Sequence, residues 1–163
     1  MTDFSSKLVV YYNINMYNDT ASPIKAHYIK SLDFPLVNKA SDYSVAVTKS
    51  KFDISNLIPD PLPVDGKRVD KLIIQSSTLS VIGSVYANNL QNQTIMDVDY
   101  RQDDNISPLY YQPAYLQPLT LSNPLPIQLI DVRVVVQYED GTQKDFMIPP
   151  QTNWTCRLAF IRR

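Results

Sequence analysis

The sequence predicts an all-β protein, and three observations carry that prediction. Apolar and polar side chains alternate over several stretches, and a period of two places every second side chain on one face of a strand. Glu139 is the only Glu among 16 acidic residues, so a good helix former is almost absent. The chain also contains 12 prolines, which disfavour long helices, and 11 tyrosines, which suit half-buried strands.

The first half of the chain predicts three strands. Residues 7–17 alternate most regularly, with Leu8, Val10, Tyr12, Ile14 and Met16 on the apolar face. Residues 25–29 predict a short strand. Residues 41–54 predict a longer one, and its alternation slips within 48–51, which indicates a β-bulge.

The middle of the chain mixes strands with proline-rich segments. Three prolines within 59–63 forbid regular structure there. Residues 71–75 and 78–86 predict strands that could form a hairpin, and 94–100 predict another. Residues 101–127 hold five prolines and three tyrosines. Their apolar and aromatic content predicts an ordered loop or arm that packs on something, because long irregular segments in compact domains are usually functional.

The last 35 residues predict an antiparallel meander. Two alternating runs, 132–138 and 142–148, flank Asp140-Gly141, and Gly accepts the positive φ that tight hairpin turns need. Pro149-Pro150 ends the second run, and 154–161 forms a third. In phase with these patterns, the residues expected in the core are Leu8, Val10, Tyr12, Val45, Val134, Val136, Trp154, Leu158 and Phe160.

Composition narrows the function classes. A chain of 163 residues without internal repeats fits one domain, 1–163, of roughly seven to nine strands in a sandwich or barrel. The net charge of −1 argues against a general nucleic-acid binder, and no sequence-specific nucleic-acid partner is expected. No apolar run reaches membrane-spanning length, and the first residues lack a signal-peptide core, so we expect no secretion. The single Cys156 excludes an intrachain disulfide and is expected to be a buried thiol.

Signals for catalysis and cofactors are weak. His27 is the only histidine and has no nucleophile motif around it, so a structural role is expected and no enzyme is predicted. No cofactor is predicted. The one candidate metal site is an acidic cluster for Ca²⁺, which prefers oxygen ligands, although the alternative is solvated turn carboxylates. Its residues are Asp97, Asp99, Asp103 and Asp104.

The tyrosines provide the other functional signal. Tyrosine is enriched at protein interfaces, because its ring buries area while its hydroxyl keeps a partner. The alternative is that these rings cover the protein's own sheets. The residues predicted at a subunit contact are Tyr110, Tyr111 and Tyr115 in the proline-rich segment, with Tyr11 and Tyr17 on the polar face of the first strand.

Two stretches resemble a known family. The first runs from Asp33-Phe34-Pro35 to Val45-Ala46-Val47, followed by Lys51-Phe52-Asp53-Ile54 and the prolines of 59–63. The second runs from Pro124-Leu125-Pro126-Ile127 through Asp131-Val132, Asp140-Gly141 and Ile148-Pro149-Pro150 to Arg157-Leu158-Ala159-Phe160-Ile161-Arg162. Together they resemble the penton-type or minor capsid proteins of virophages, polinton-like elements and related double-stranded DNA viruses, although Lys51 stands where that family usually has Arg.

The resemblance implies a fold and a role. It implies a single jelly-roll β-sandwich of about eight antiparallel strands in two four-stranded sheets, assembling as a pentamer at capsid vertices. The expected partners are further copies of the chain and other capsid proteins. The expected location is the virion, after synthesis in a host cell. The alternative from the residues alone is a β-sandwich ligand-binding or adaptor module, such as a carbohydrate-binding or phage attachment domain.

Overall fold

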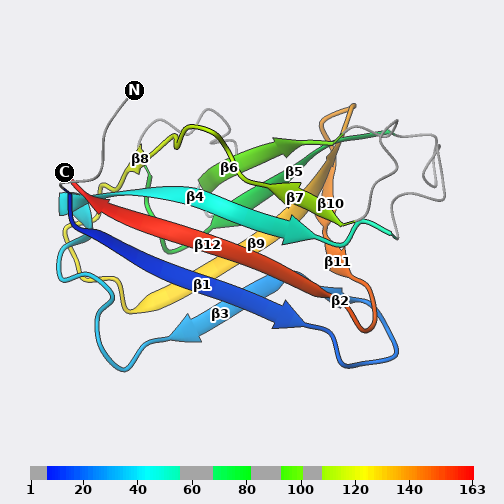
Figure 1. The fold of residues 1–163 in the computed structure, drawn as a ribbon, viewed down its shortest axis with the longest axis horizontal. Coiled ribbons are helices and arrows are strands. Elements are labelled where there is room, and N and C mark those ends of the chain that lie inside the picture. The colour runs from blue at the N-terminus through cyan, green and yellow to red at the C-terminus, as the bar shows by residue number, and fades with distance from the viewer. Residues whose placement is uncertain (1–6, 56–67, 82–92, 101–107) are drawn as a thin grey trace.

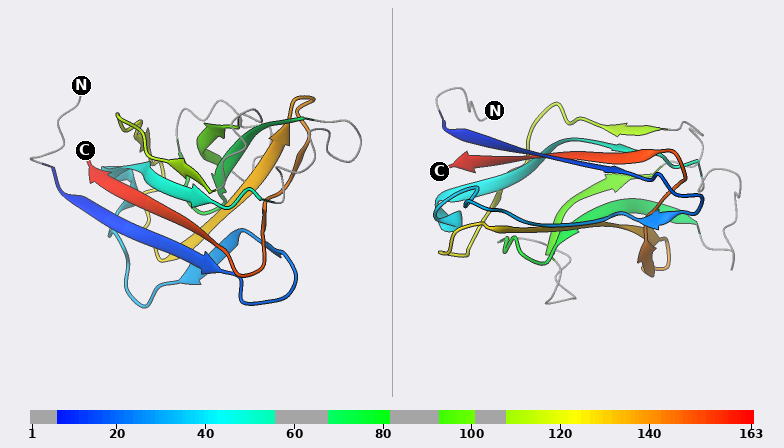
Figure 2. Two further views of the ribbon diagram at one scale, coloured as in Figure 1. Left: turned by 45° about the vertical axis from the view of Figure 1, so that its right-hand side comes forward. Right: turned by 90° about the horizontal axis from the view of Figure 1, so that it is seen from below.

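Two antiparallel sheets face each other in the computed structural model, which describes residues 7–55, 68–81, 93–100 and 108–163. The first sheet contains β1 (Val9–Tyr17), β12 (Asn153–Arg162), β4 (Tyr43–Phe52) and β7 (Leu109–Tyr111), in that order, and β8 (Leu119–Thr120) also pairs with β4. The second contains β10 (Gln143–Asp145), β9 (Leu129–Tyr138), β5 (Val69–Ser76) and β6 (Gln93–Asp99), and β3 (His27–Ser31) pairs with β9. Figure 1 shows the first sheet in front, and the view from below in Figure 2 shows the two layers edge-on.

The chain passes back and forth between these layers. It runs from β1 in the first sheet to β3 in the second, returns for β4, crosses again for β5 and β6, and ends in β12. The order β1-β12-β4-β7 opposite β3-β9-β5-β6 is a jelly roll, so the all-β fold class and the jelly-roll topology are confirmed. A small third sheet joins β2 (Ile24–Lys25) to β11 (Met147–Ile148), and a 3₁₀ turn, η1 (Ala40–Asp42), precedes β4.

Large side chains from both sheets fill the space between the layers. Trp154, Phe52, Phe146 and Phe160 are fully buried, and the rings of Phe52 and Phe146 meet edge to face at 5.9 Å. The indole Nε1 of Trp154 donates a hydrogen bond to Ser50 Oγ at 3.2 Å, which satisfies its one polar atom inside the core. The strands of the first sheet are therefore held by both packing and a buried polar contact.

Most of the predicted core is confirmed. Val45, Val134, Val136, Trp154, Leu158 and Phe160 are buried, while Val10 and Tyr12 are half-buried and pack against the core. Leu8 is the exception, because 55% of it is exposed. It keeps the phase of the strand but lies before β1 begins, and periodicity cannot tell where the opposite sheet stops covering a face.

The β-bulge expected within 48–51 is present. Lys49 pairs with Arg157 and Val47 pairs with Leu158, so Thr48 is the extra residue of β4. After this bulge Ser50 and Phe52 point into the core, whereas Lys49 and Lys51 point outward. The bulge thus resets which side chains of β4 reach the outer face.

The prediction of a strand over 78–86 is wrong for its described part. Residues 78–80 are irregular, Val81 makes only an isolated bridge to Leu121, and β5 pairs with β6 instead. The Oγ of Ser76 accepts hydrogen bonds from the N–H groups of Thr78 and Leu79, so a side chain replaces the ladder partner and turns the chain. Residues 82–86 lie outside the described residues, as do 59–63.

The predicted terminal meander is also wrong, although its hairpin is present. β9 and β10 pair through the turn at Gly141, whose φ is +84°. The run 142–148 then divides between β10 and β11, and β12 crosses to the other sheet, where it pairs with β1 and β4. Pro149 and Pro150 cannot donate to a ladder, and the chain is tied instead to the end of β1 by Asn18.

The proline-rich segment 101–127 is described from residue 108 onward. It lies along β4, to which both β7 and β8 pair, and the rest of it is irregular. No helix in the described parts of the chain has the length and hydrophobicity needed to span a membrane.

Candidate interaction surface

The outer face of the first sheet brings together the side chains with the clearest capacity to bind a partner. On β1 the odd-numbered residues point outward, and they include Tyr11, Asn13, Asn15 and Tyr17. Tyr11 and Tyr17 are 56% and 54% exposed, because their neighbours in the strand take the inward positions. This outward row places aromatic and amide groups along one edge of the sandwich.

Hydrogen bonds across the sheet fix this polar row. Arg157 Nε donates to Asn13 Oδ1 at 2.8 Å, and its guanidinium lies 5.5 Å from the centre of the Tyr11 ring. Two residues further along β1, Asn15 Oδ1 accepts a hydrogen bond from Asn153 Nδ2 at 3.0 Å, and Lys51 Nζ donates to Asn153 Oδ1 at 2.7 Å. These contacts hold the side chains in place before any partner arrives, which lowers the entropy lost on binding.

The charge of the first sheet differs from that of the second. The strands β1, β4, β7, β8 and β12 contain no Asp or Glu, whereas Lys49, Lys51 and Arg157 point outward from them. The strands of the second sheet carry carboxylates at Asp70, Asp97, Asp99, Asp131 and Asp145. The outer face of the first sheet is therefore cationic and aromatic.

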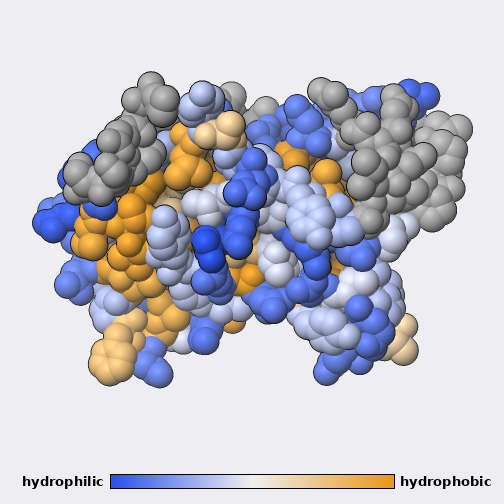
Figure 3. Space-filling model, viewed as in Figure 1, coloured by the Kyte–Doolittle hydropathy of each residue, from blue (hydrophilic) through white to orange (hydrophobic). Residues whose placement is uncertain are grey.

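This face changes character along its length. Ala46, Ala159 and Ile161 also point outward, yet they are buried, and they lie towards the end where β1 begins and β12 finishes. Figure 3 shows a hydrophobic area at that end of the face and hydrophilic atoms over its middle. The amides, the cations, Tyr17 and Tyr110 therefore occupy the middle and the far end, whereas Tyr11 lies opposite Ala159 at the border of the hydrophobic area.

The tyrosines predicted at a subunit contact separate into two groups. Tyr11, Tyr17 and Tyr110 share the outer side of the first sheet, and Tyr110, which is 71% exposed, lies on β7 at the opposite edge. Tyr115, which is 68% exposed, lies in the segment that joins β7 to β8. Tyr111 instead packs against the protein's own core, and burial, together with the nearby Asp97, raises the pKa of its hydroxyl. The structure thus places exposed tyrosines along both edges of one sheet.

Only half of the candidate calcium cluster lies in the described residues. Asp97 Oδ2 makes an ion pair with Lys71 Nζ at 3.2 Å, which supplies the carboxylate with a cation from the protein itself. Asp99 lies two residues along β6, and Asp103 and Asp104 lie outside the described residues. Among the residues that the structure does describe, no three side chains of His, Cys, Asp or Glu gather in a way that could hold a metal.

The imidazole of His27 has a partner on a neighbouring strand that the sequence alone does not reveal. Its Nε2 lies 2.8 Å from Asp131 Oδ1, and Ser77 Oγ donates to the other carboxylate oxygen at 2.8 Å. The carboxylate stands between the serine and the histidine, whereas activation of a serine needs a direct hydrogen bond to the imidazole. The arrangement ties β3 and the chain after β5 to β9, which is a structural role. Register would have revealed it, since His27 and Asp131 lie on neighbouring strands.

The thiol of Cys156 is part of the core. It is 2% exposed, and burial raises its pKa to about 12, although a hydrogen bond with Ser50 acts in the opposite direction. A thiol that ionises so late has little thiolate at neutral pH and is a poor nucleophile. The expectation of a buried thiol is therefore confirmed.

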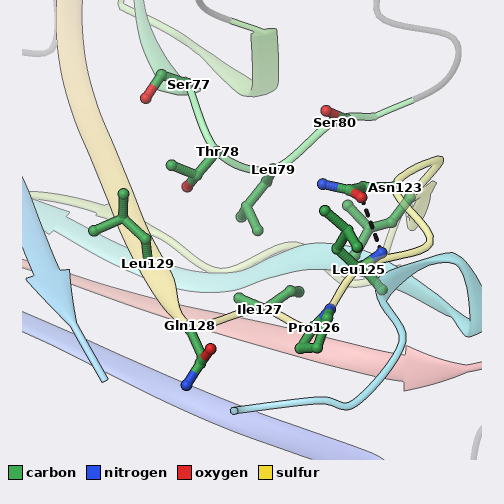
Figure 4. A pocket seen from close by; sticks show the side chains of 12 residues that line it. Ser77, Thr78, Leu79, Ser80, Asn123, Leu125, Pro126, Ile127, Gln128 and Leu129 are labelled. Atoms are coloured by element: carbon green, nitrogen blue, oxygen red, sulfur yellow. Dashed lines mark hydrogen bonds between the residues drawn. The ribbon is translucent and has the colours of Figure 1, made fainter. Parts of the chain in front are cut away.

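A hollow of about 320 Å³ lies between the chain after β5 and the segment before β9 (Figure 4). Buried Leu79, Leu121 and Ile127 line it, together with Leu125 and Leu129, which are 63% and 44% exposed. At the rim, Asn123 Oδ1 accepts a hydrogen bond from the Leu125 N–H at 2.9 Å, which forms a local turn in this segment. An apolar side chain from another molecule would fit such a hollow.

Comparisons with known proteins reveal likeness in fold. No protein-family model matches the sequence, and no curated protein matches it. A chain in the cryo-EM structure of the Sputnik virophage superposes with a TM-score of 0.73 at 12% identity, covering 94% of this chain and 98% of that one. The mavirus penton protein superposes with a TM-score of 0.69 at 8% identity, covering 96% and 100%. The resemblance to virophage penton proteins seen in the sequence is therefore confirmed at the level of the fold.

Proposed function

We propose that this chain is a structural protein of a viral capsid, and that it forms a pentameric ring at a capsid vertex. The observation that carries the proposal is the likeness to the mavirus penton protein, which extends over 96% of this chain and the whole of that one. The chain thus spans the whole fold of that penton protein. The proposed role is assembly, and the proposed place is the virion, after synthesis in a host cell.

The positions of the exposed tyrosines support a ring. In a closed ring each subunit offers one patch to the neighbour on one side and a different patch to the other. Tyr11 and Tyr17 line one edge of the first sheet, Tyr110 lies on β7 at the opposite edge, and Tyr115 lies in the segment that joins β7 to β8. Two aromatic patches on opposite sides of one molecule are what such a contact needs, because tyrosine rings contribute strongly to interface energy.

Contact with other capsid proteins is a second part of the proposal. The hollow rimmed by Leu125 and Leu129 lies at the end of the sandwich, away from Tyr110. An apolar side chain of a neighbouring capsomer would bury these two exposed leucines. A vertex protein needs contacts of this kind, because a ring alone does not attach to the surrounding shell.

The test of the proposal is the mass of the purified protein in solution together with its presence in purified particles. We expect a species of five times the 18.6 kDa chain mass, and we expect the chain in washed virions. A protein that stays monomeric at high concentration and never accompanies virions would contradict the proposal. The measurement needs no ligand, so its result does not depend on identifying the partner first.

A carbohydrate-binding module is the second candidate, and the outer face favours it. Tyr11, Arg157 and the Asn residues of β1 form an exposed aromatic and amide surface of the kind that can stack on and hydrogen-bond to a sugar. This function requires the face to stay accessible. A monomer that binds immobilised glycans, and loses that binding when Tyr11 is replaced by Ala, would favour this candidate over the capsid role.

A further inference from the structure

We propose that β1 pairs edge to edge with β7 of the neighbouring copy, so that the first sheet continues from one subunit into the next. The inference rests on the proposed ring and names the contact that would hold it together. Tyr11 and Tyr17 lie on β1 and Tyr110 lies on β7, so this pairing would bring exposed tyrosines of two copies to the same contact.

β1 is an edge strand without the usual protection against pairing. Its nine residues contain no charged side chain, no proline and no glycine. It pairs with β12 from Val9 to Tyr17 without any register shift, so no bulge turns its edge away. Long, regular and uncharged edges of this kind are templates for another strand, and natural proteins usually block them.

The hydrogen bonds at both ends of β1 identify the backbone groups that face outward. Arg162 N–H donates to Leu8 O at 3.0 Å, and Asn18 N–H donates to Thr152 O at 2.9 Å. In an antiparallel pair every second residue bonds to the neighbour, so the even-numbered residues of β1 face β12. The odd-numbered residues, with Asn13 at the centre, direct their N–H and C=O groups away from the sheet. In the described chain β1 pairs with β12 alone.

The same alternation identifies the outward backbone groups at the other edge. The backbone oxygen of Thr155 accepts a hydrogen bond from Ser50 Oγ, so the backbone groups of Thr155 point towards β4. The backbone groups of its register partner, Lys51, therefore point towards β12. The backbone groups of Ser50 and Phe52 then point towards β7, where these residues pair with Tyr111 and Leu109. Tyr110 is left with its N–H and C=O directed to the outer edge of β7.

The side chains at the two edges point in directions that are compatible with pairing between β1 and β7 of two copies. At β1 the residues with outward backbone groups also have side chains on the outer face, and the same holds for Tyr110, which is 71% exposed. Pairing Tyr110 with an odd-numbered residue of β1 therefore keeps the outer faces of both subunits continuous. It also keeps the apolar faces of both sandwiches inside. A pairing shifted by one residue would turn apolar side chains outward.

The directions of β1 and β7 are also compatible with antiparallel pairing between neighbouring copies in a ring. The four strands β1, β12, β4 and β7 alternate in direction, so β1 and β7 of one subunit run antiparallel. A ring whose axis lies along the strands preserves these directions and sets β1 of one copy antiparallel to β7 of the next. Pairing β1 with β1 would instead require a two-fold axis across the strands, and it would give a dimer that closes on itself.

The first experiment removes one outward N–H. Asn13→Pro deletes that group while sparing the bonds to β12, because proline is tolerated at the outer side of an edge strand. Asn13→Ala is the matched control, since both variants lose the contact with Arg157 but only proline lacks the N–H. We expect Asn13→Ala to keep the ring and Asn13→Pro to give a folded monomer. A ring of unchanged mass for Asn13→Pro would overturn the inference.

The second experiment detects the contact directly and does not depend on proline being tolerated. Tyr110→Cys is combined in turn with Tyr11→Cys, Asn13→Cys and Asn15→Cys, and each double variant is oxidised or treated with a short bismaleimide. We expect a covalent ladder up to the full ring for one of these pairs, and none for any single variant. Native Cys156 is buried and should not react.

The outcomes separate the inference from the proposed function. A ring that persists but forms no ladder with any pair would overturn the strand pairing and leave the capsid role intact. If two copies of the single variant Asn13→Cys were cross-linked to each other, the pairing of β1 with β7 would be overturned in favour of a two-fold contact between β1 strands. An unmodified protein that is monomeric and absent from virions would remove the ring itself, and the pairing with it.

Discussion

The two edges of the first sheet are built in opposite ways. β1 is a nine-residue strand with an unbroken register, whereas the other edge consists of β7 and β8, which have three and two residues. Pro113 and Pro118 lie between these two short strands, and short strands and prolines are two of the ways in which proteins block an edge. One edge is therefore open along its length, and the other is open only around Tyr110. A molecule with one long and one short open edge can extend its sheet in a single direction.

The largest expected effect comes from the strand that separates the two edges. Phe160 of β12 is fully buried, so Phe160→Ala should lower the free energy of unfolding by about 3–5 kcal/mol. Because β12 lies between β1 and β4, the loss of its packing should destabilise both edges of the first sheet together. Chemical denaturation measures the change, with Arg162→Ala at an exposed position of the same strand as the control. A loss below about 1 kcal/mol would mean that this face of β12 is not packed.

The next effect concerns the point where β1 ends. Asn18 is fully buried, and its Nδ2 donates to Ile148 O at 2.9 Å and to Ser22 O at 2.8 Å. Asn18→Ala should lower the free energy of unfolding by about 1–3 kcal/mol, because it removes a buried hydrogen bond to the carbonyl of Ile148. The exposed Asn15→Ala is the matched control. Equal, small losses for the two variants would show that Asn18 does not anchor the strand.

A smaller effect is expected where β1 meets the second sheet. The hydroxyls of Tyr12 and Tyr28 lie 2.7 Å apart, so Tyr12→Phe should lower the free energy of unfolding by about 1 kcal/mol. Burial and the hydrogen bond to Tyr28 raise the pKa of Tyr12. The neutral hydroxyl is therefore favoured in the folded state, and its contribution is present below the unfolded pKa of about 10 and is lost as the pH rises above it.

Denaturation curves recorded from pH 8 to alkaline pH check this sign. Above a pH of about 10, the free energy of unfolding of the unmodified protein should fall more steeply than that of Tyr12→Phe. Parallel losses for the two proteins would mean that other groups govern unfolding in alkali. The comparison isolates the β1 side, because β7 has no corresponding pair of hydroxyls among the described residues.

The smallest effect on stability, with a large effect on assembly, is expected from the exposed tyrosines. Replacing Tyr11 and Tyr17 by Ser, or Tyr110 and Tyr115 by Ser, should change the free energy of unfolding by no more than about 0.5 kcal/mol. Each double variant should nevertheless be monomeric by light scattering, because a ring needs both edges.

Mixing the two double variants sharpens the comparison. Each double variant retains one intact edge, and the two intact edges are complementary. The mixture should therefore contain dimers that combine one copy of each variant, and it should contain no rings. A mixture that stays monomeric would mean that the tyrosines do not act as separate patches. Rings formed by either variant alone would mean that the exposed tyrosines are not part of the contact.

The sequence predicted strands well because alternation is a local property. The inward residues of β12, such as Trp154 and Leu158, and the bulge at Thr48 follow from the phase of neighbouring side chains. Pairing is not local, and the predicted terminal meander failed for that reason. Nothing in the run 154–161 indicates that it pairs with β1 and β4 instead of β10. The failure over 78–81 had another cause, since the hydroxyl of Ser76 competes with a ladder partner.

The candidate surface was predictable only in part. The tyrosines could be selected by type, and Tyr11 and Tyr17 could be placed outward from the phase of β1. The sequence could not distinguish Tyr110 from Tyr111, because a three-residue strand is too short to show a period. The contact between His27 and Asp131 also required the register of β3 on β9.

The place of β12 between β1 and β4 has a consequence for synthesis of the protein. Among the described strands β12 comes last in the chain, yet it alone lies between β1 and β4 in the first sheet. While the polypeptide is still emerging from the ribosome, β1 and β4 have no strand between them, and half of the sandwich cannot form. The sheet can close only after residues 153–162 have left the exit tunnel. Pairing between such distant segments is slow, and it makes the nascent chain dependent on protection from aggregation until then.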